Sequence, residues 1–186
     1  MDRPSERADA ARNRARVLDA AGGLLAERDG GAVTMEEIAA AAGVGKATLY
    51  RRYPDVASIA VALLDEHERD LQERLLRGPA PLGPGAPPAE RLAAFYRAMV
   101  ELLERHGHLA LAAETGARRY ATGAYQAWRL HVGALLDDAG VDDAAGLTDA
   151  LLAPLAPELY AYQRASGRSS RAIADALDAL ARRVVG

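Results

Sequence analysis

The sequence predicts an all-α protein with a small N-terminal head and a larger helical body. Half of its 186 residues are hydrophobic, mostly alanine and leucine, with a single phenylalanine. This composition favours helix outside the glycine- and proline-rich stretches. Apolar residues recur with the helical period along the chain, and no segment alternates with the two-residue period of a half-buried strand. We expect a head over residues 1–56 and a body over residues 57–186.

Composition also excludes several classes of site. The chain has no cysteine, which rules out disulfides, thiolate metal sites and a cysteine nucleophile. Its N-terminus lacks the apolar stretch of a signal peptide, and no apolar run approaches the roughly 18 residues that span a membrane. We therefore expect a cytoplasmic protein with no membrane partner. The net charge of −3, with nine bases against eight acids in residues 1–53, is no sign of nucleic-acid binding by itself.

Three helices are predicted in the head. The first covers residues 12–27, because Val17, Ala20, Ala21, Leu24 and Leu25 recur at helical spacing, and Asp29-Gly30-Gly31 should end it. A second covers residues 35–42, where Thr34 and Glu37 have the spacing of a capping box. Gly43-Val44-Gly45 interrupts the pattern, and a short third helix, residues 46–52, ends before Pro54.

The body should begin with a helix over about residues 56–77, capped by Asp55. Residues 78–88, GPAPLGPGAPP, hold five of the nine prolines and predict an exposed loop inside the body. Further helices are expected over residues 89–106, 108–114, 120–139, 143–165 and 169–185. Pro154 and Pro157 should kink or split the fourth of these.

Residues 34–53, TMEEIAAAAGVGKATLYRRY, have the features of a helix-turn-helix. Such a motif needs small residues where its helices pack, a glycine turn, and a second helix that exposes short polar and basic side chains. Ala39 and Ala40, then Gly43, then Lys46 to Thr48 supply these in order. The alternative is an ordinary helical hairpin in a bundle. The second helix has one convincing core residue, Leu49, which is too few to explain the helix by burial.

This stretch resembles the DNA-binding head of the TetR (tetracycline-repressor) family of bacterial transcription regulators. The family pattern is T-x-x-x-I-A-x-x-A-G-V-[SG]-x-x-[TS]-[LIV]-Y-x-[HYR]-[FY], preceded by a helix with A-A-x-x-L-[LF]. Residues 34–53 and the segment Ala20–Leu25 match it nearly throughout. The resemblance covers about the first quarter of the chain and the helix that follows. It implies a homodimer that places its third helices in the major grooves of a palindromic operator.

The resemblance also implies roles for individual residues. Thr34 and Tyr50 would bind phosphates with help from Arg51 and Tyr53. Base edges or nearby DNA backbone would be contacted by Gly45, Lys46, Ala47 and Thr48. The chemistry agrees, since lysine pairs with guanine and tyrosine hydroxyls donate to phosphate. Two positions depart from the pattern. Gly45 replaces a common serine cap, and Val56 replaces a lysine that often contacts phosphate.

The resemblance assigns dimerisation to the last two helices and a ligand cavity to the body. Leu151, Leu152, Leu155 and Leu159 line one of these helices, and Ile173, Leu177, Leu180 and Val184 line the other. A monomer core would have the same pattern. Candidate pocket residues for a flat or amphipathic effector are the aromatic and titratable side chains of the middle helices: Tyr96, Met99, Tyr125, Trp128 and His131. Ordinary core packing explains them equally well.

We expect no metal, no cofactor and no enzymatic activity. His106-Gly107-His108 lacks a third ligand nearby, and the chain has no phosphate loop, HExxH or G-x-S-x-G motif. The expected function is a repressor released from DNA by a small molecule. The alternatives are a DNA-binding regulator that acts without a ligand or under control of a protein, and a helical enzyme or adaptor with an accidental head motif.

Overall fold

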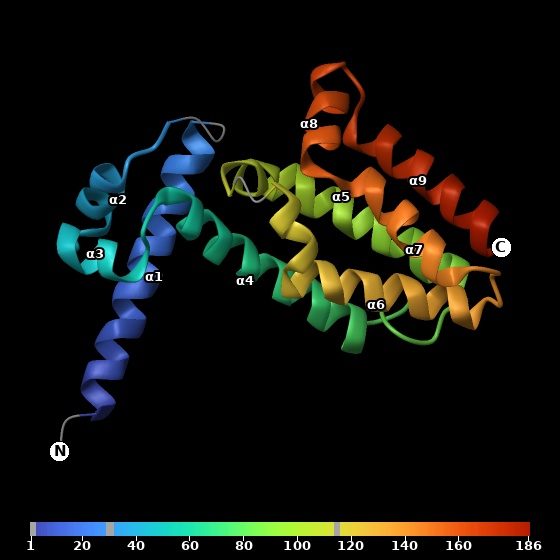
Figure 1. The fold of residues 1–186 in the computed structure, drawn as a ribbon, viewed down its shortest axis with the longest axis horizontal. Helices are drawn as coiled ribbons and strands as arrows, with labels where there is room; N and C mark the ends of the chain where they lie inside the picture. The colour runs from blue at the N-terminus through green and yellow to red at the C-terminus, as the bar shows by residue number, and fades with distance from the viewer. Residues whose placement is uncertain (1–2, 29–31, 114–115) are drawn as a thin grey trace. The chain divides into compact units, whose positions relative to one another are not determined.

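The computed structural model describes residues 3–28, 32–113 and 116–186 (Figure 1). Across these residues it consists of α-helices and short 3₁₀ helices without a strand, which confirms the all-α prediction. The chain divides into two compact units. One comprises Met1–Asp65 with His108–Glu114, and the other comprises Glu66–Gly107 with Thr115–Gly186. No helix in the described part is long and apolar enough to cross a membrane.

The first unit contains α1 (Arg3–Glu27), α2 (Met35–Ala42), α3 (Lys46–Arg52) and the start of α4 (Val56–Arg77). Its core joins Leu25 of α1, Ile38 of α2, Leu49 of α3 and Ile59 of α4, each at most 2% exposed. The bounds of α2 and α3 are those predicted from the sequence. The predicted stop signal at residues 29–31 lies outside the described residues.

Helix α1 begins at Arg3, well before the predicted start near Arg12. Its early turns carry good helix formers such as Ala10 and Ala11, and residues 9–12 are exposed. Apolar periodicity reports the face that a helix buries, so it cannot detect turns that rely on intrinsic propensity. The predicted boundary lies nearer to Val17, the first residue of α1 described as buried, than to the start of the helix.

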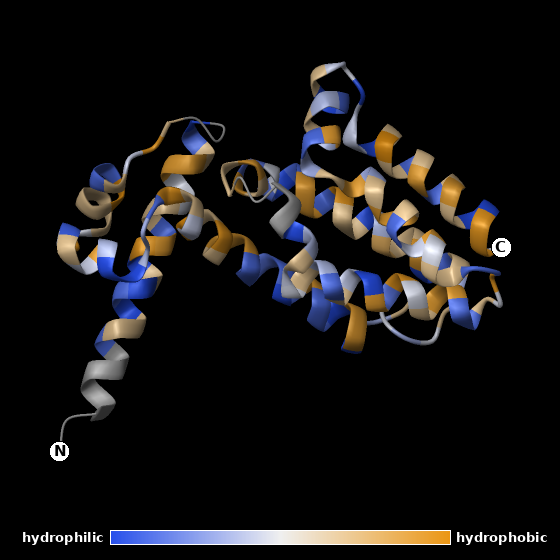
Figure 2. Cartoon of the chain, in the orientation of Figure 1, coloured by the Kyte–Doolittle hydropathy of each residue, from blue (hydrophilic) through white to orange (hydrophobic). Residues whose placement is uncertain are grey.

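The second unit contains the rest of α4 and most of α5 (Pro88–Ala112). It continues through η1 (Gly116–Ala121), α6 (Gly123–Asp138), α7 (Ala144–Leu152), η2 (Ala153–Leu155), α8 (Pro157–Ala165) and α9 (Ser170–Val185). These helices carry both hydrophobic and hydrophilic residues (Figure 2). The hydrophobic sides meet in one core around Phe95, Tyr96, Trp128 and Leu136. Residues 78–87 join α4 to α5 without helix, as the prolines predict.

Two predicted boundaries in the body have different outcomes. The expected break at His106-Gly107-His108 is wrong, because α5 runs unbroken to Ala112. A single glycine inside a helix costs only about 1 kcal/mol relative to alanine, and the packing of Leu103 and Leu109 on either side holds this turn. The expected split of residues 143–165 is confirmed, since α7 ends before Pro154 and α8 starts at Pro157.

Side-chain hydrogen bonds connect the body helices across the core. The buried Tyr96 hydroxyl donates to the Leu151 carbonyl of α7 at 2.9 Å, and burial raises the pKa of Tyr96. Glu104 of α5 accepts hydrogen bonds from Tyr160 and from both Nε and Nη2 of Arg164, the last two at 3.0 Å. These bonds tie α5 to α7 and α8.

Candidate nucleic-acid interface

The entry into α2 is held by a capping box and an arginine. The Glu37 amide donates to the Thr34 hydroxyl oxygen at 3.2 Å, and the Thr34 amide and hydroxyl both donate to the Glu37 carboxylate at 2.8 Å. Arg28 donates to the same carboxylate at 2.7 Å and to the Ala32 carbonyl at 2.6 Å. Arg28 first, and then Thr34, lower the pKa of Glu37 to about 2. These contacts fix the start of α2 against the end of α1.

The turn between α2 and α3 depends on Gly43 and Arg16. Gly43 has φ of 61°, a left-handed conformation that favours glycine. Its amide closes α2 by donating to the carbonyls of Ala39 and Ala40. Arg16 of α1 reaches across the turn and donates to the carbonyls of Ala42 and Gly43, the latter at 2.6 Å. A Cβ at Gly43 would lie 2.7 Å from Nη2 of Arg16, so the end of the Arg16 side chain would have to move.

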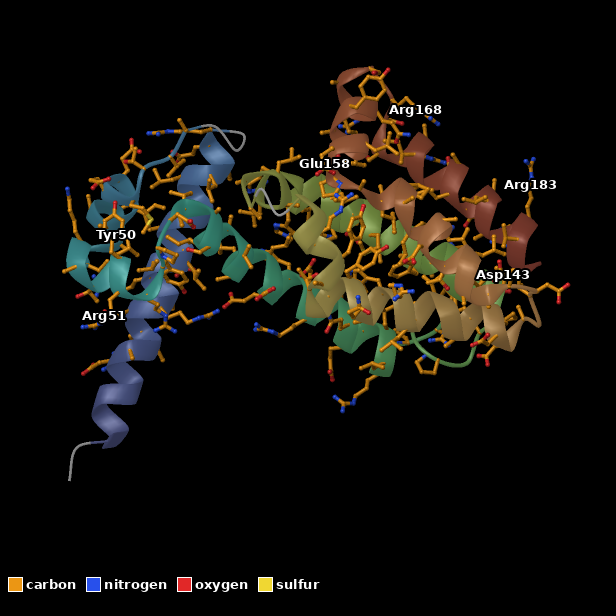
Figure 3. The ribbon with its side chains drawn as sticks, in the orientation of Figure 1. Tyr50, Arg51, Asp143, Glu158, Arg168 and Arg183 are labelled. Atoms are coloured by element: carbon orange, nitrogen blue, oxygen red, sulfur yellow. The ribbon has the colours of Figure 1, made fainter. Side chains whose placement is uncertain are left out.

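Helix α3 exposes almost all of its side chains. Of its seven residues, all of them described, only Leu49 is buried. Lys46, Ala47, Thr48 and Arg51 are exposed, and the Tyr50 side chain is 45% exposed. Figure 3 labels Tyr50 and Arg51, two of the exposed residues of this helix. One buried leucine anchors α3, which leaves its outer surface available for a partner.

The two departures from the family pattern have structural consequences. Gly45 begins α3 without a side-chain hydrogen bond to the helix, so the first amides of α3 have no capping hydroxyl. At the start of α4, Asp55 accepts from the Ser58 amide at 2.8 Å. Val56 is half-buried and packs against the core of the first unit, and it carries no charge for a phosphate. A lysine contact from this position is therefore missing.

Glu36 is a residue of this surface that the sequence reasoning missed. Its carboxylate lies 3.4 Å from Nζ of Lys46, and the pair is well exposed. A backbone hydrogen bond first, then Lys46, and more weakly Tyr50, lower the pKa of Glu36. Lys46 and Tyr50 lie one turn apart on the same face of α3, so Glu36 contacts both proposed DNA-binding side chains. The spacing of ten residues between Glu36 and Lys46 crosses the turn, and no local sequence signal predicts it.

Tyr53 differs from the other predicted contacts, because it is only 6% exposed. It follows the last turn of α3, where its amide donates to the Leu49 carbonyl at 2.9 Å. The Arg52 guanidinium lies 5.9 Å from the centre of the Tyr53 ring. Most of Tyr53 therefore packs in the head core. The remaining predicted residues, Thr34, Gly45, Lys46, Ala47, Thr48, Tyr50 and Arg51, are exposed.

The five candidate pocket residues lie in the body in two environments. Tyr96, Met99 and Trp128 are buried in the core, and none is more than 6% exposed. The Tyr125 hydroxyl donates to Asp149 at 3.0 Å, and burial and then Asp149 raise the pKa of Tyr125 to about 12. His131 packs against Phe95 with ring centres 5.3 Å apart. Phe95 thus joins Tyr96, Trp128 and His131 in one aromatic cluster.

Two hollows in the body lie away from these five residues. The larger, about 320 Å³, is bounded by Arg74 of α4, the segment Pro79–Leu82 and Arg97 of α5. The smaller, about 110 Å³, lies where His67 of α4 stacks on His106 of α5, with ring centres 3.6 Å apart. Imidazole lone pairs lie in the ring plane, so parallel rings at this distance do not point at a common metal ion.

A compact three-helix unit with a glycine turn and an outward-facing last helix defines the class of helix-turn-helix proteins. Within it, residues 17–63 match the family described as bacterial regulatory proteins, tetR family. An uncharacterised helix-turn-helix transcriptional regulator of Mycobacterium tuberculosis is 41% identical over 56 residues, which cover 30% of each chain. Another from the same organism is 36% identical over 77 residues, 41% of this chain and 37% of the relative. The matched segments thus span only 30% and 37% of the length of these relatives.

Solved structures extend the likeness in fold to nearly the whole chain. A TetR-like transcriptional regulator from Rhodococcus sp. RHA1 has a TM-score of 0.63 at 24% identity, covering 92% of this chain and 94% of that one. The fatty acid degradation regulator FadR from Bacillus halodurans has a TM-score of 0.68 at 15% identity, with coverage of 90% and 93%. Residues 17–63 therefore match the head of the tetR family of bacterial regulatory proteins, and the likeness over the rest of the chain is one of fold.

Proposed function

We propose that the chain is a transcriptional repressor that binds a palindromic DNA operator as a homodimer and leaves it when a small-molecule effector occupies the body. The observation that carries the proposal is helix α3, which buries Leu49 and exposes Lys46, Thr48, Tyr50 and Arg51. A helix held by so little burial, behind a turn locked by Arg16, is suited to enter a major groove. Action on DNA would place the protein in the cytoplasm.

The exposed residues of α3 divide into two roles. Tyr50 and Arg51 would bind phosphates, because a phenol and a guanidinium both donate to phosphate oxygens. Lys46 would contact a guanine edge and the Ala47 methyl group a thymine methyl group. The Thr34 hydroxyl is hydrogen-bonded to Glu37. Thr34 would therefore assist phosphate binding by holding the start of α2 in place. Tyr53 would support α3 from the core.

The dimer is proposed to form through the outer faces of α8 and α9. The predicted stripe of Ile173 and Leu177 packs into the body's own core, so it is already used within the chain. On α8, Leu159 is 39% and Tyr162 70% exposed. On α9, the exposed Ala172, Ala176 and Ala179 recur along one face, and short side chains allow two helices to approach closely.

Release would follow from a change in the spacing of the two heads. Two-fold related α3 helices must lie about 34–36 Å apart to enter successive major grooves. An effector that binds the body more tightly at another spacing would shift the population away from the DNA-binding state. The middle-helix residues Tyr96, Met99, Tyr125, Trp128 and His131 are proposed to line or support its site.

A binding assay with the full chain tests the proposal. DNA upstream of the protein's own gene is mixed with wild-type protein, with Lys46→Ala and with Tyr50→Ala, and complexes are separated by gel shift. We expect a dimer complex with wild type and its loss with either variant, while circular dichroism and sedimentation stay unchanged. Arg77→Ala on α4 is a matched control at an exposed basic residue outside α3, α8 and α9. Equal binding by all four proteins would contradict the assigned roles.

A further inference from the structure

Among the buried polar atoms that have no hydrogen-bond partner in the described residues are two nitrogen atoms on neighbouring body helices. They are Nε of Arg91 on α5 and Nε2 of His131 on α6. Leaving a buried polar atom unpaired destabilises a fold, and most such atoms in folded proteins are paired. Two of them within one small region point to a ligand or a water that bonds both.

Phe95 brings the two residues together. Arg91 lies one turn before Phe95 on α5, so the two side chains share a face of the helix. The His131 ring packs against Phe95 with ring centres 5.3 Å apart and planes inclined by 53°. Both Arg91 and His131 are half-buried, whereas Phe95 is fully buried. The region therefore places two nitrogen atoms beside a buried aromatic cluster.

The charges around His131 favour an anion. Burial first, and then the positive charge of Arg91, lower the pKa of His131 to about 4. The imidazole is therefore neutral at pH 7, and Arg91 opposes its protonation. A negative group placed between them would offset the Arg91 charge and accept hydrogen bonds from both side chains. Binding would then draw a proton onto His131, because the imidazolium form donates from both nitrogens.

We propose that Arg91 and His131 form an anion subsite in the body that binds the carboxylate of an effector whose apolar part packs on the aromatic cluster of Phe95. The inference rests on the proposed effector control and names the chemical class of the ligand. A planar carboxylate fits because a guanidinium and an imidazolium present directed N–H donors, and each bond is charge-assisted. Arg91 is a residue that the sequence reasoning did not single out. The sequence feature that could have identified Arg91 is its position one helical turn before the only phenylalanine.

Benzoate is the probe, and benzamide is its neutral counterpart of nearly equal shape. Isothermal titration calorimetry with the full chain at pH 7, in two buffers of different ionisation enthalpy, measures affinity and proton uptake. We expect benzoate to bind at least about tenfold more tightly than benzamide, as loss of charge-assisted hydrogen bonds implies. We also expect proton uptake on binding, and tighter binding as the pH is lowered from 7 towards 5.

Variants assign the effect to the two side chains. Arg91→Met keeps an apolar stem but removes the guanidinium, and His131→Phe keeps a ring beside Phe95 but removes both nitrogens. Each is expected to weaken benzoate binding at least about tenfold, and His131→Phe should abolish proton uptake. His131→Gln serves if the phenylalanine variant does not fold. Arg105→Met, on the same helix, is the control and should bind benzoate like wild type.

Equal affinity for benzoate and benzamide would overturn the proposal. So would wild-type affinity in Arg91→Met, or no benzoate binding at millimolar concentration, since the two nitrogens would then be satisfied by water alone. Gel shifts without benzoate distinguish a failure of the anion subsite from a failure of the proposed repressor function. Arg91→Met should still bind operator DNA, whereas a wild-type protein that binds no operator would refute the repressor itself.

Discussion

Helices α3 and α9 are stabilised in opposite ways. Helix α3 has seven residues and buries Leu49, whereas α9 has sixteen and buries Ile173, Leu177 and Ala181 in the body core. Helix α9 is therefore held by its own hydrophobic face, and α3 is held by the turn and the helices before it. A helix with little to bury leaves most of its surface open to a partner, and for α3 the proposed partner is DNA. The buried stripe of α9 gives no comparable information about a partner.

The turn before α3 is where the largest effect is expected. Gly43→Ala places a side chain at a φ of 61° and 2.7 Å from Arg16, so Arg16 must release the carbonyls that it holds. Left-handed strain alone costs about 1–3 kcal/mol, and the displaced α3 should lose operator affinity about a hundredfold. Gel shift and thermal unfolding measure both quantities.

Gly107→Ala is the matched control for that change. Gly107 lies inside α5 with no heavy atom within 4 Å of an added Cβ. Replacing a helical glycine by alanine should leave stability unchanged or raise it by about 0.5–1 kcal/mol. If the two alanine variants behave alike, the turn does not hold α3 in the way described.

The exposed face of α9 is the next point to test. Ala176→Glu puts a charge in the proposed helix–helix contact, where a buried unpaired carboxylate is costly. We expect the dimer dissociation constant to rise more than about tenfold, as measured by analytical ultracentrifugation. Ala134→Glu, at an exposed position on α6, should have no effect. Dissociation by both variants, or by neither, would place the dimer contact elsewhere.

Acid should weaken the head through Glu37. Its folded pKa of about 2 lies below the ordinary value of 4.5, so the ionised form stabilises the head above about 4.5, and this stabilisation is lost as the pH falls towards 2. Glu37→Gln removes this dependence. Urea unfolding followed by circular dichroism should show a shallower acid decline for Glu37→Gln than for wild type. Glu73→Gln, which removes another exposed glutamate paired with an arginine, is the control and should decline as wild type does.

The smallest effect is expected at Glu36. Glu36→Gln frees Lys46 from its carboxylate partner and removes a negative charge from the DNA-facing surface. Exposed ion pairs are weak, so operator affinity should rise only about two- to fivefold. Fluorescence anisotropy with labelled operator resolves such a change. Asp138→Asn on α6 is the control and should bind operator like wild type. If Glu36→Gln also binds like wild type, Glu36 does not compete with DNA for Lys46.

The head was more predictable from sequence than the body because its signals are local. The Thr34–Glu37 cap and the glycine turn fix α2 and α3 within a few residues, and both helices have the predicted bounds. The contacts that complete the surface are distant in sequence. Arg16 reaches a turn 27 residues away, and Glu36 reaches Lys46 across it, and neither contact has a periodic signature. The pairing of Arg91 with His131 likewise depends on how α5 packs on α6.

The most direct test of the account is the salt dependence of operator affinity. Each phosphate contact contributes a slope of about −0.9 to log affinity against log salt concentration. We expect a steep negative slope for the full chain, a slope shallower by about one unit per head for Arg51→Ala, and no change for Arg77→Ala on α4. A shallow slope for wild type, or equal slopes for the three proteins, would contradict the claim that the exposed face of α3 binds DNA.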